Sequence, residues 1–80
     1  MSNKLWDDEY RSFQDAIKQI RVKAGMTQVE LSAALDKPQS YVSKYERGER
    51  KLDFIETMSV CEACGVTVTQ FHNVFSKLRK

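Results

Sequence analysis

The 80-residue chain has little proline, glycine, cysteine and histidine, and it has no long apolar run. One proline and three glycines leave few places where a helix must end, so the composition is typical of a mostly helical chain with sharp turns. No apolar stretch approaches the ~20 residues that a membrane-spanning helix needs, and the first residues form no export signal. We therefore expect a single cytoplasmic domain with reduced cysteines and no membrane contact.

Residues that carry chemistry are also few. Cys61 and Cys64 have the C-x-x-C spacing, but they fall within an expected helix, and His72 is the only histidine. Structural zinc requires four ligands at known spacings, so we expect no metal or other cofactor, and we expect the cysteines to pack as small apolar groups. His72 is expected on the outer side of the last helix. The chain offers no nucleophile beside a base, no pair of catalytic acids and no glycine-rich phosphate loop, so we expect no enzymatic activity.

The net charge of +2 is too small to indicate a nucleic-acid partner by itself, and it disfavours a protein that coats DNA without regard to sequence. The charge is nevertheless uneven along the chain. Between residues 37 and 51 the cations Lys37, Lys44, Arg47, Arg50 and Lys51 stand against Glu46 and Glu49. The acids Asp53, Glu56 and Glu62 follow, with no cation before Lys77. A basic stretch between acidic ones is typical of a surface that contacts nucleic acid.

Apolar spacing and capping signals predict an all-α fold of five helices. The first helix is expected to begin at Asp7 or Asp8, after an N-terminal arm of residues 1–6, and to end at Gly25. Its apolar residues repeat at the i, i+3, i+4 spacing of a buried stripe. They are Phe13, Ala16, Ile17, Ile20 and Ala24.

Three pairs of residues have the spacing of a capping box, in which two side chains each bond the other's backbone N–H at a helix start. The pairs Thr27–Glu30, Asp53–Glu56 and Thr67–Gln70 predict where the second, fourth and fifth helices begin. The fourth helix is expected to run to about Cys64, and the last lies within residues 66–80. The residues expected to face the core are Leu31, Ala34 and Leu35 in the second helix and Ile55, Met58, Val60 and Cys61 in the fourth.

A helix-turn-helix is expected over residues 27–47, with the third helix from Pro38 to Arg47. Asp36 is expected to make the turn, because Asp tolerates a positive φ better than most residues, and Pro38 fixes φ where the helix starts. At 100° per residue, one face of this helix, ~140° wide, carries only amides, hydroxyls and cations. Its members are Gln39, Ser40, Ser43, Lys44 and Arg47. Such groups read base edges and contact phosphates, whereas Val42 and Tyr45 lie on the opposite face.

The side chains of the polar face have distinct expected roles. Gln39 offers a donor and an acceptor that match adenine N6 and N7, and Lys44 can donate to guanine or to a phosphate. Ser40 and Ser43 are short enough to let the helix lie close to the bases. Tyr41, at the margin, can cover apolar surface with its ring while its hydroxyl reaches a phosphate. The cations expected to contact phosphates without regard to sequence are Arg47, Arg50 and Lys51.

The stretch from Arg21 to Phe71 resembles the helix-turn-helix domain of Cro and the phage repressors, the Xre family. The segments MTQVEL, SYVSKYERG and LDFIETMSVCEACGVTVTQF follow the order and spacing of that family's second helix, third helix and later helices. The resemblance implies a compact lambda-repressor-like domain that binds DNA. Three residues depart from the family's pattern: Asp36 replaces the usual turn glycine, Lys37 an apolar residue and Pro38 a capping Ser or Thr. Lys37 thereby adds a cation where the third helix starts.

The resemblance also assigns roles to single residues. It implies that Gln28 holds a phosphate at the start of the second helix and that a buried ion pair joins Arg21 to Glu46 at the end of the third. It further implies base reading near the start of the third helix and again one turn later. The complete DNA-contacting set is Gln28, Lys37, Gln39, Ser40, Tyr41, Ser43, Lys44, Arg47, Arg50 and Lys51.

The fifth helix carries a wide apolar stripe. Its members are Phe71, Val74, Phe75 and Leu78. We expect this stripe to pair two copies of the chain, because a second copy would complete a small core and place two recognition helices about 34 Å apart on a palindromic operator. The alternative is that both phenylalanines fill the core of a single copy.

Together these features predict a bacterial or phage-encoded transcriptional regulator, acting as a repressor, that binds double-stranded DNA as a homodimer. The alternative is a protein-interaction module or an antitoxin-type partner protein that keeps the fold and binds a protein through the same face. The lack of apolar residues on the outward face of the third helix disfavours that alternative.

Overall fold

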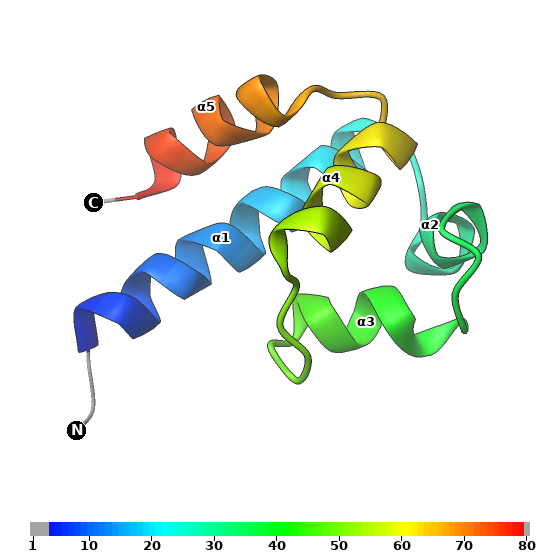
Figure 1. Ribbon diagram of the computed structural model, residues 1–80, viewed down its shortest axis with the longest axis horizontal. Coiled ribbons are helices and arrows are strands. Elements are labelled where there is room, and N and C mark those ends of the chain that lie inside the picture. Colours follow the sequence, from blue (N-terminus) through cyan, green and yellow to red (C-terminus); the bar gives the residue numbers. More distant parts are fainter. Residues whose placement is uncertain (1–3, 80) are drawn as a thin grey trace.

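The computed structural model describes residues 4–79, with side chains from Asp8 onward, and this range folds into five α-helices (Figure 1). The helices are α1 (Lys4–Lys23), α2 (Gln28–Ala34), α3 (Ser40–Glu46), α4 (Phe54–Ala63) and α5 (Val68–Leu78). The predicted all-α fold of five helices is confirmed. Within the described residues, no helix is long and apolar enough to cross a membrane.

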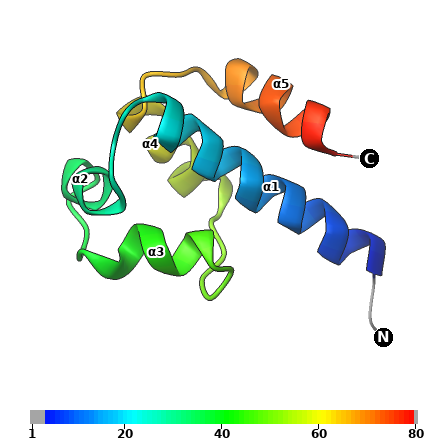
Figure 2. The same cartoon turned by 180° about the vertical axis from the view of Figure 1, so that it is seen from behind.

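The long helix α1 organises the others. α5 lies along one side of α1 and α3 on the opposite side, and both views agree on this arrangement (Figures 1 and 2). α2 packs against α3, and α4 packs against both α2 and α5. The helix-turn-helix of α2 and α3 therefore lies across α1 from α5.

The first helix begins earlier than predicted. Lys4 already belongs to α1, so residues 4–6 form its first turn and are no arm, while residues 1–3 lie outside the described part of the chain. The acids that follow interact favourably with the positive end of the helix whether they cap it or lie in its first turns, so their presence did not mark the start. The predicted stop is confirmed, since Gly25 has a φ of 75°.

All three predicted capping boxes are present. They join Thr27 to Glu30, Asp53 to Glu56 and Thr67 to Gln70. In the first box the Thr27 N–H donates to Glu30 Oε1 at 2.8 Å, and the Glu30 N–H donates to Thr27 Oγ1 at 3.0 Å. Asp36 makes the turn between α2 and α3 with a φ of 58°, as predicted.

One hydrophobic core joins the five helices. Its buried members include Ala16, Ile17, Ile20, Leu31, Val42, Tyr45, Val60, Cys61 and Phe71. Two predicted core residues, Ala24 and Ala34, are exposed instead. Both continue the apolar spacing of their helices, but Ala24 follows the end of α1 and Ala34 is the last residue of α2, where the chain turns away from the core.

The inward face of α4 differs from the predicted one. Ile55 is 68% exposed and Met58 is 37% exposed, whereas Thr57, Val60 and Cys61 are buried. Thr57 tolerates burial because its hydroxyl donates to the Asp53 carbonyl at 2.8 Å. Apolar residues occur on both faces of this helix, so periodicity alone could not choose between them. Packing against α2 and α5 decided the choice.

The apolar stripe of α5 packs against α1. Phe71 is buried and meets the Phe13 ring edge to face, with 5.5 Å between the ring centroids, and Phe75 lies 6.5 Å from the same ring. Val74, Phe75 and Leu78 are half-buried against the core. At the end of α5, Arg79 forms an ion pair with Glu9 at 2.6 Å. Phe71 is therefore a core residue and no part of a dimer interface, which corrects that prediction.

Candidate nucleic-acid interface

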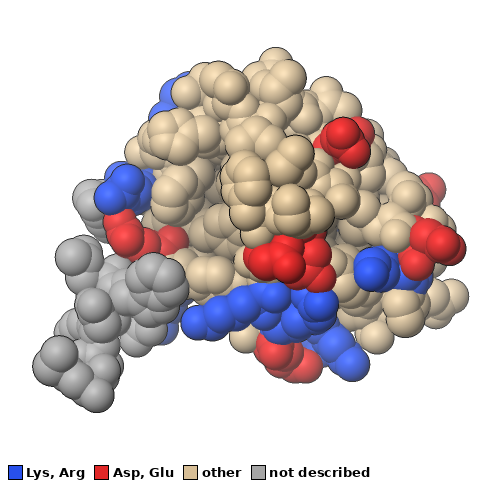
Figure 3. Space-filling view, viewed as in Figure 1, with Lys and Arg blue, Asp and Glu red and all other residues tan. Residues whose placement is uncertain are grey.

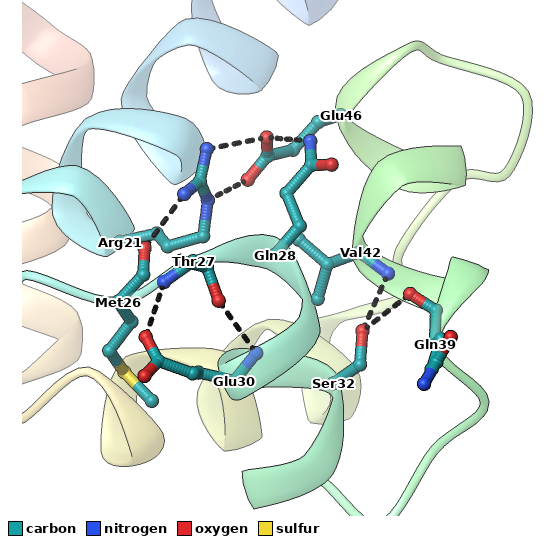
Figure 4. A network of polar contacts seen from close by, with 9 residues as sticks. All are labelled: Arg21, Met26, Thr27, Gln28, Glu30, Ser32, Gln39, Val42 and Glu46. Carbon is teal, nitrogen blue, oxygen red and sulfur yellow. Dashed lines mark hydrogen bonds and ion pairs between the residues drawn. The ribbon is translucent and has the colours of Figure 1, made fainter.

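A fully buried serine sets the angle between α2 and α3. Ser32 Oγ accepts a hydrogen bond from the Val42 N–H at 3.2 Å and donates one to the Gln39 carbonyl at 3.2 Å (Figure 4). These bonds satisfy polar groups at the start of α3, which has no side-chain cap of its own. Ser32 thereby fixes where α3 starts relative to α2. The small size of Ser32 suggested close helix packing, but the sequence did not reveal this second bond to α3.

A buried ion pair holds the other end of α3. Arg21 Nε lies 2.7 Å from Glu46 Oε2, and Arg21 Nη2 donates to Glu46 Oε1 at 3.1 Å (Figure 4). Arg21 Nη1 also donates to the Met26 carbonyl at 2.8 Å. The hydrogen bonds to Glu46 raise the pKa of Arg21, against the opposing effect of burial. This is the pair that the family resemblance implied, and it joins α1 to the end of α3.

Gln28 completes this network. Its Nε2 donates to Glu46 Oε1 at 3.0 Å, so the first residue of α2 is tied to the last residue of α3. Gln28 is half-buried beside the ion pair. The structure therefore gives Gln28 a positioning role, and its contact with a phosphate stays a prediction.

The two faces of α3 are divided as predicted. Val42 and Tyr45 are buried, and the exposed side carries a set of polar residues. The exposed members are Gln39, Ser40, Lys44 and Arg47, with Ser43 half-buried among them. The helix itself is shorter than predicted, because Ser40 is its first residue and Glu46 its last. Pro38 still belongs to the same turn, since its carbonyl accepts from the Tyr41 N–H at 2.9 Å.

Tyr41 lies beneath the basic surface and is only 8% exposed. Its hydroxyl donates to Glu56 Oε2 at 3.4 Å, and its ring meets the Tyr45 ring edge to face at 5.5 Å. Lys37 Nζ and the Arg50 guanidinium lie 5.4 and 5.1 Å from the centre of the ring. Burial raises the pKa of the hydroxyl. Tyr41 thus supports two cations from below, which differs from the predicted phosphate contact by its hydroxyl.

The cations that follow α3 interact with neighbouring residues. Arg47 Nε lies 2.8 Å from Glu49 Oε2, and Arg50 Nη2 lies 2.7 Å from Glu56 Oε2. The Arg50 hydrogen bond is the main reason why the pKa of Glu56 falls to about 2. Lys51 Nζ lies 4.9 Å from the centre of a ring in α1, that of Tyr10. In Figure 3 these charges form a band of mixed sign along one edge of the molecule.

The comparisons with known proteins agree with this geometry. A helix-turn-helix family model matches residues 17–71. The chain belongs to the Xre-type helix-turn-helix family. A solved structure, an XRE-family like protein from Pseudomonas syringae pv. tomato str. DC3000, is 42% identical with a TM-score of 0.76, and the match covers 90% of this chain and 84% of that one. No protein with curated function matches the chain. Membership places this Xre-type chain among DNA-binding regulators.

The cysteines of this Xre-type chain are buried, free thiols. Burial raises the pKa of Cys61 to about 11, and burial also raises that of Cys64. Among the described residues, no three His, Cys, Asp or Glu side chains gather as metal ligands would. His72 is exposed on α5, and its Nε2 lies 3.4 Å from Ser76 Oγ.

Sequence reasoning missed two residues that shape the interface, Ser32 and Glu56. Glu56 was identified only as a capping residue, yet the structure shows that it also receives Arg50 and Tyr41. The available signal was its spacing of six residues from Arg50, which a loop of unknown shape could not convert into a contact. Both roles depend on how the helices meet.

Proposed function

We propose that this chain is a sequence-specific transcriptional repressor that reads the major groove of double-stranded DNA with α3. The observation that carries the proposal is the division of α3 into two faces. Its buried face is aromatic and aliphatic, while Gln39, Ser40 and Lys44 are exposed. Amides, hydroxyls and cations are the groups that read base edges and contact phosphates.

The way in which α3 is held supports the same function. Ser32 fixes its start and the Arg21–Glu46 pair fixes its end. Reading a base with two hydrogen bonds requires a side chain in a narrow range of positions, so a recognition helix fixed at both ends suits the task. Gln39 then pairs with adenine, and Lys44, one turn later, donates to guanine or to a phosphate.

Cations around α3 supply the contacts to the DNA backbone. They are Lys37, Arg47, Arg50 and Lys51. Arg47 and Arg50 are held by carboxylates in the free protein, so a phosphate must compete with Glu49 and Glu56 for them. Each phosphate contact releases counter-ions, and this set therefore governs the salt dependence of binding more than its specificity.

The repressor acts as a homodimer on a palindromic operator. One copy presents a single recognition helix of seven residues to one half-site. Two copies related by a twofold axis would read two half-sites about 34 Å apart, one turn of DNA. Occupancy of the operator then blocks transcription.

Selection from randomised DNA duplexes, with excess competitor DNA, tests the proposal. We expect a defined sequence to be retained and Gln39→Ala to lose about 1–3 kcal/mol of binding and to relax one base position. The fold should tolerate this change, because Ser32 bonds the backbone of Gln39 and not its side chain. Gln19→Ala, exposed on α1, is the matched control and should bind as the parent does.

The other outcomes point elsewhere. Equal retention of every duplex would mean binding without regard to sequence. No retention at all would favour the protein-interaction or antitoxin-type module. Either result would overturn the proposal.

A further inference from the structure

The outward face of α4 carries three large apolar side chains. Phe54 is 65% exposed, Ile55 68% and Met58 37%. These are three of the five exposed large hydrophobic residues in the described part of the chain, the others being Val22 and Val29. At 100° per residue the three fall within an arc of ~100°, opposite the buried face of α4. We call this arc the α4 face.

The α4 face is uncharged in a chain of which 30% is charged. Figure 3 shows the side of the molecule on which α4 lies, and the surface there is largely free of Lys, Arg, Asp and Glu. Both signs of charge meet at its edge, where Arg50 and Glu56 form their ion pair at 2.7 Å. Clustered exposed apolar residues with a polar rim are typical of a surface that another protein covers.

We propose that the α4 face binds the α4 face of a second copy of this chain; the inference rests on the proposed function. A surface that meets itself across a twofold axis cannot carry one sign of charge, because like charges would then face each other. The α4 face meets this condition, since its centre is neutral and its rim is mixed. Two antiparallel α4 helices with Met58 near the axis would bring each Phe54 towards the far end of the partner helix.

The position of the α4 face suits a DNA-binding dimer. Glu56, in the first turn of α4, binds both Arg50 and Tyr41, so the start of α4 is tied to α3 and to the loop between them. Pairing through α4 therefore sets the separation of the two recognition helices. The α5 stripe, by contrast, is already packed against α1, with Phe71 buried.

The small size of the α4 face predicts weak association in solution. Three side chains cover well below the ~800 Å² per partner of a standard interface. Two adjacent half-sites would hold the copies together and strengthen binding about a hundredfold or more over a single half-site. The dimer should therefore form most fully on an operator.

The first test uses Ile55→Glu, whose exposed position should tolerate the change, with Val22→Glu on α1 as the matched control at 57% exposure. Circular dichroism checks folding, and sedimentation measures mass alone and on DNA. We expect Ile55→Glu to lose the hundredfold gain on two half-sites and to bind a single half-site as the parent does. The control should bind both as the parent does.

The second test distinguishes a copy of the chain from any other partner. Met58→Glu and Met58→Lys should each be monomeric on a two-half-site duplex, and an equimolar mixture of the two should restore a complex with two copies. Full binding by Ile55→Glu to two half-sites, or a mixture no better than its components, would overturn the α4 pairing. Unchanged single half-site binding in that case would leave the proposed function intact, whereas loss of binding by the parent to all DNA would sink the function itself.

Discussion

Replacing Glu46 by alanine would leave Arg21 buried without its counter-ion. The two side chains are 9% and 5% exposed, and two hydrogen bonds of 2.7 and 3.1 Å join them. The change also removes the acceptor of Gln28. The Met26 carbonyl would remain as a partner of the guanidinium, but it carries no full charge. Breaking a buried pair by removing one partner costs about 3–5 kcal/mol.

This loss is large for a domain of this size. Typical domains are stable by about 5–15 kcal/mol, and 80 residues lie towards the small end. In domains of such length each kcal/mol lowers Tm by roughly 4–8 °C, so the lower bound of 3 kcal/mol predicts a fall of at least ~12 °C. Because the pair holds the end of α3, operator binding should weaken even where the variant remains folded.

Urea unfolding followed by circular dichroism measures the effect. Arg47→Ala is the control, because its ion pair with Glu49 is 55% exposed on both sides and such pairs contribute at most about 1 kcal/mol. The double change Arg21→Met and Glu46→Leu should recover most of the stability, since it removes both buried charges. The reasoning is refuted if Glu46→Ala costs no more than Arg47→Ala.

Three further outcomes are expected. Arg47→Ala should reduce the log–log slope of DNA affinity against salt by about 0.9, whereas Glu49→Gln should strengthen binding to all DNA by freeing Arg47 for a phosphate; an unchanged slope together with unchanged affinity would place this pair away from DNA. The pKa of Glu56 is lowered from 4.5 to about 2, so its contribution to stability is present above pH 4.5 and is lost as the pH falls towards 2. Acid unfolding curves should show this dependence in the parent and lose it in Glu56→Gln. Folding and DNA binding should survive a chelator and the double change Cys61→Ser and Cys64→Ala, apart from a packing loss, and stoichiometric zinc removed only on unfolding would contradict this.

Several features of the interface were predictable because their causes are local. Each capping box closes within three residues, and a glycine or an aspartate with a positive φ ends its helix without help from distant parts of the chain. The polar face of α3 follows from helical periodicity in the same way, because its opposite side has the buried Val42 and Tyr45 and no competing apolar face. The Arg21–Glu46 pair joins residues far apart in the chain, and only the family resemblance identified it.

The features that sequence reasoning did not reveal depend on how the helices meet. α4 has apolar residues on both faces, so the buried choice of Thr57 over Ile55 was made by contact with α2 and α5. Tyr41 became a support for cations because α4 brings Glu56 beneath it. Phe71 became core because α5 lies along α1. Helix starts and helix faces follow from neighbouring residues, whereas the choice between two apolar faces depends on the area that each buries against other helices, which only the tertiary structure decides.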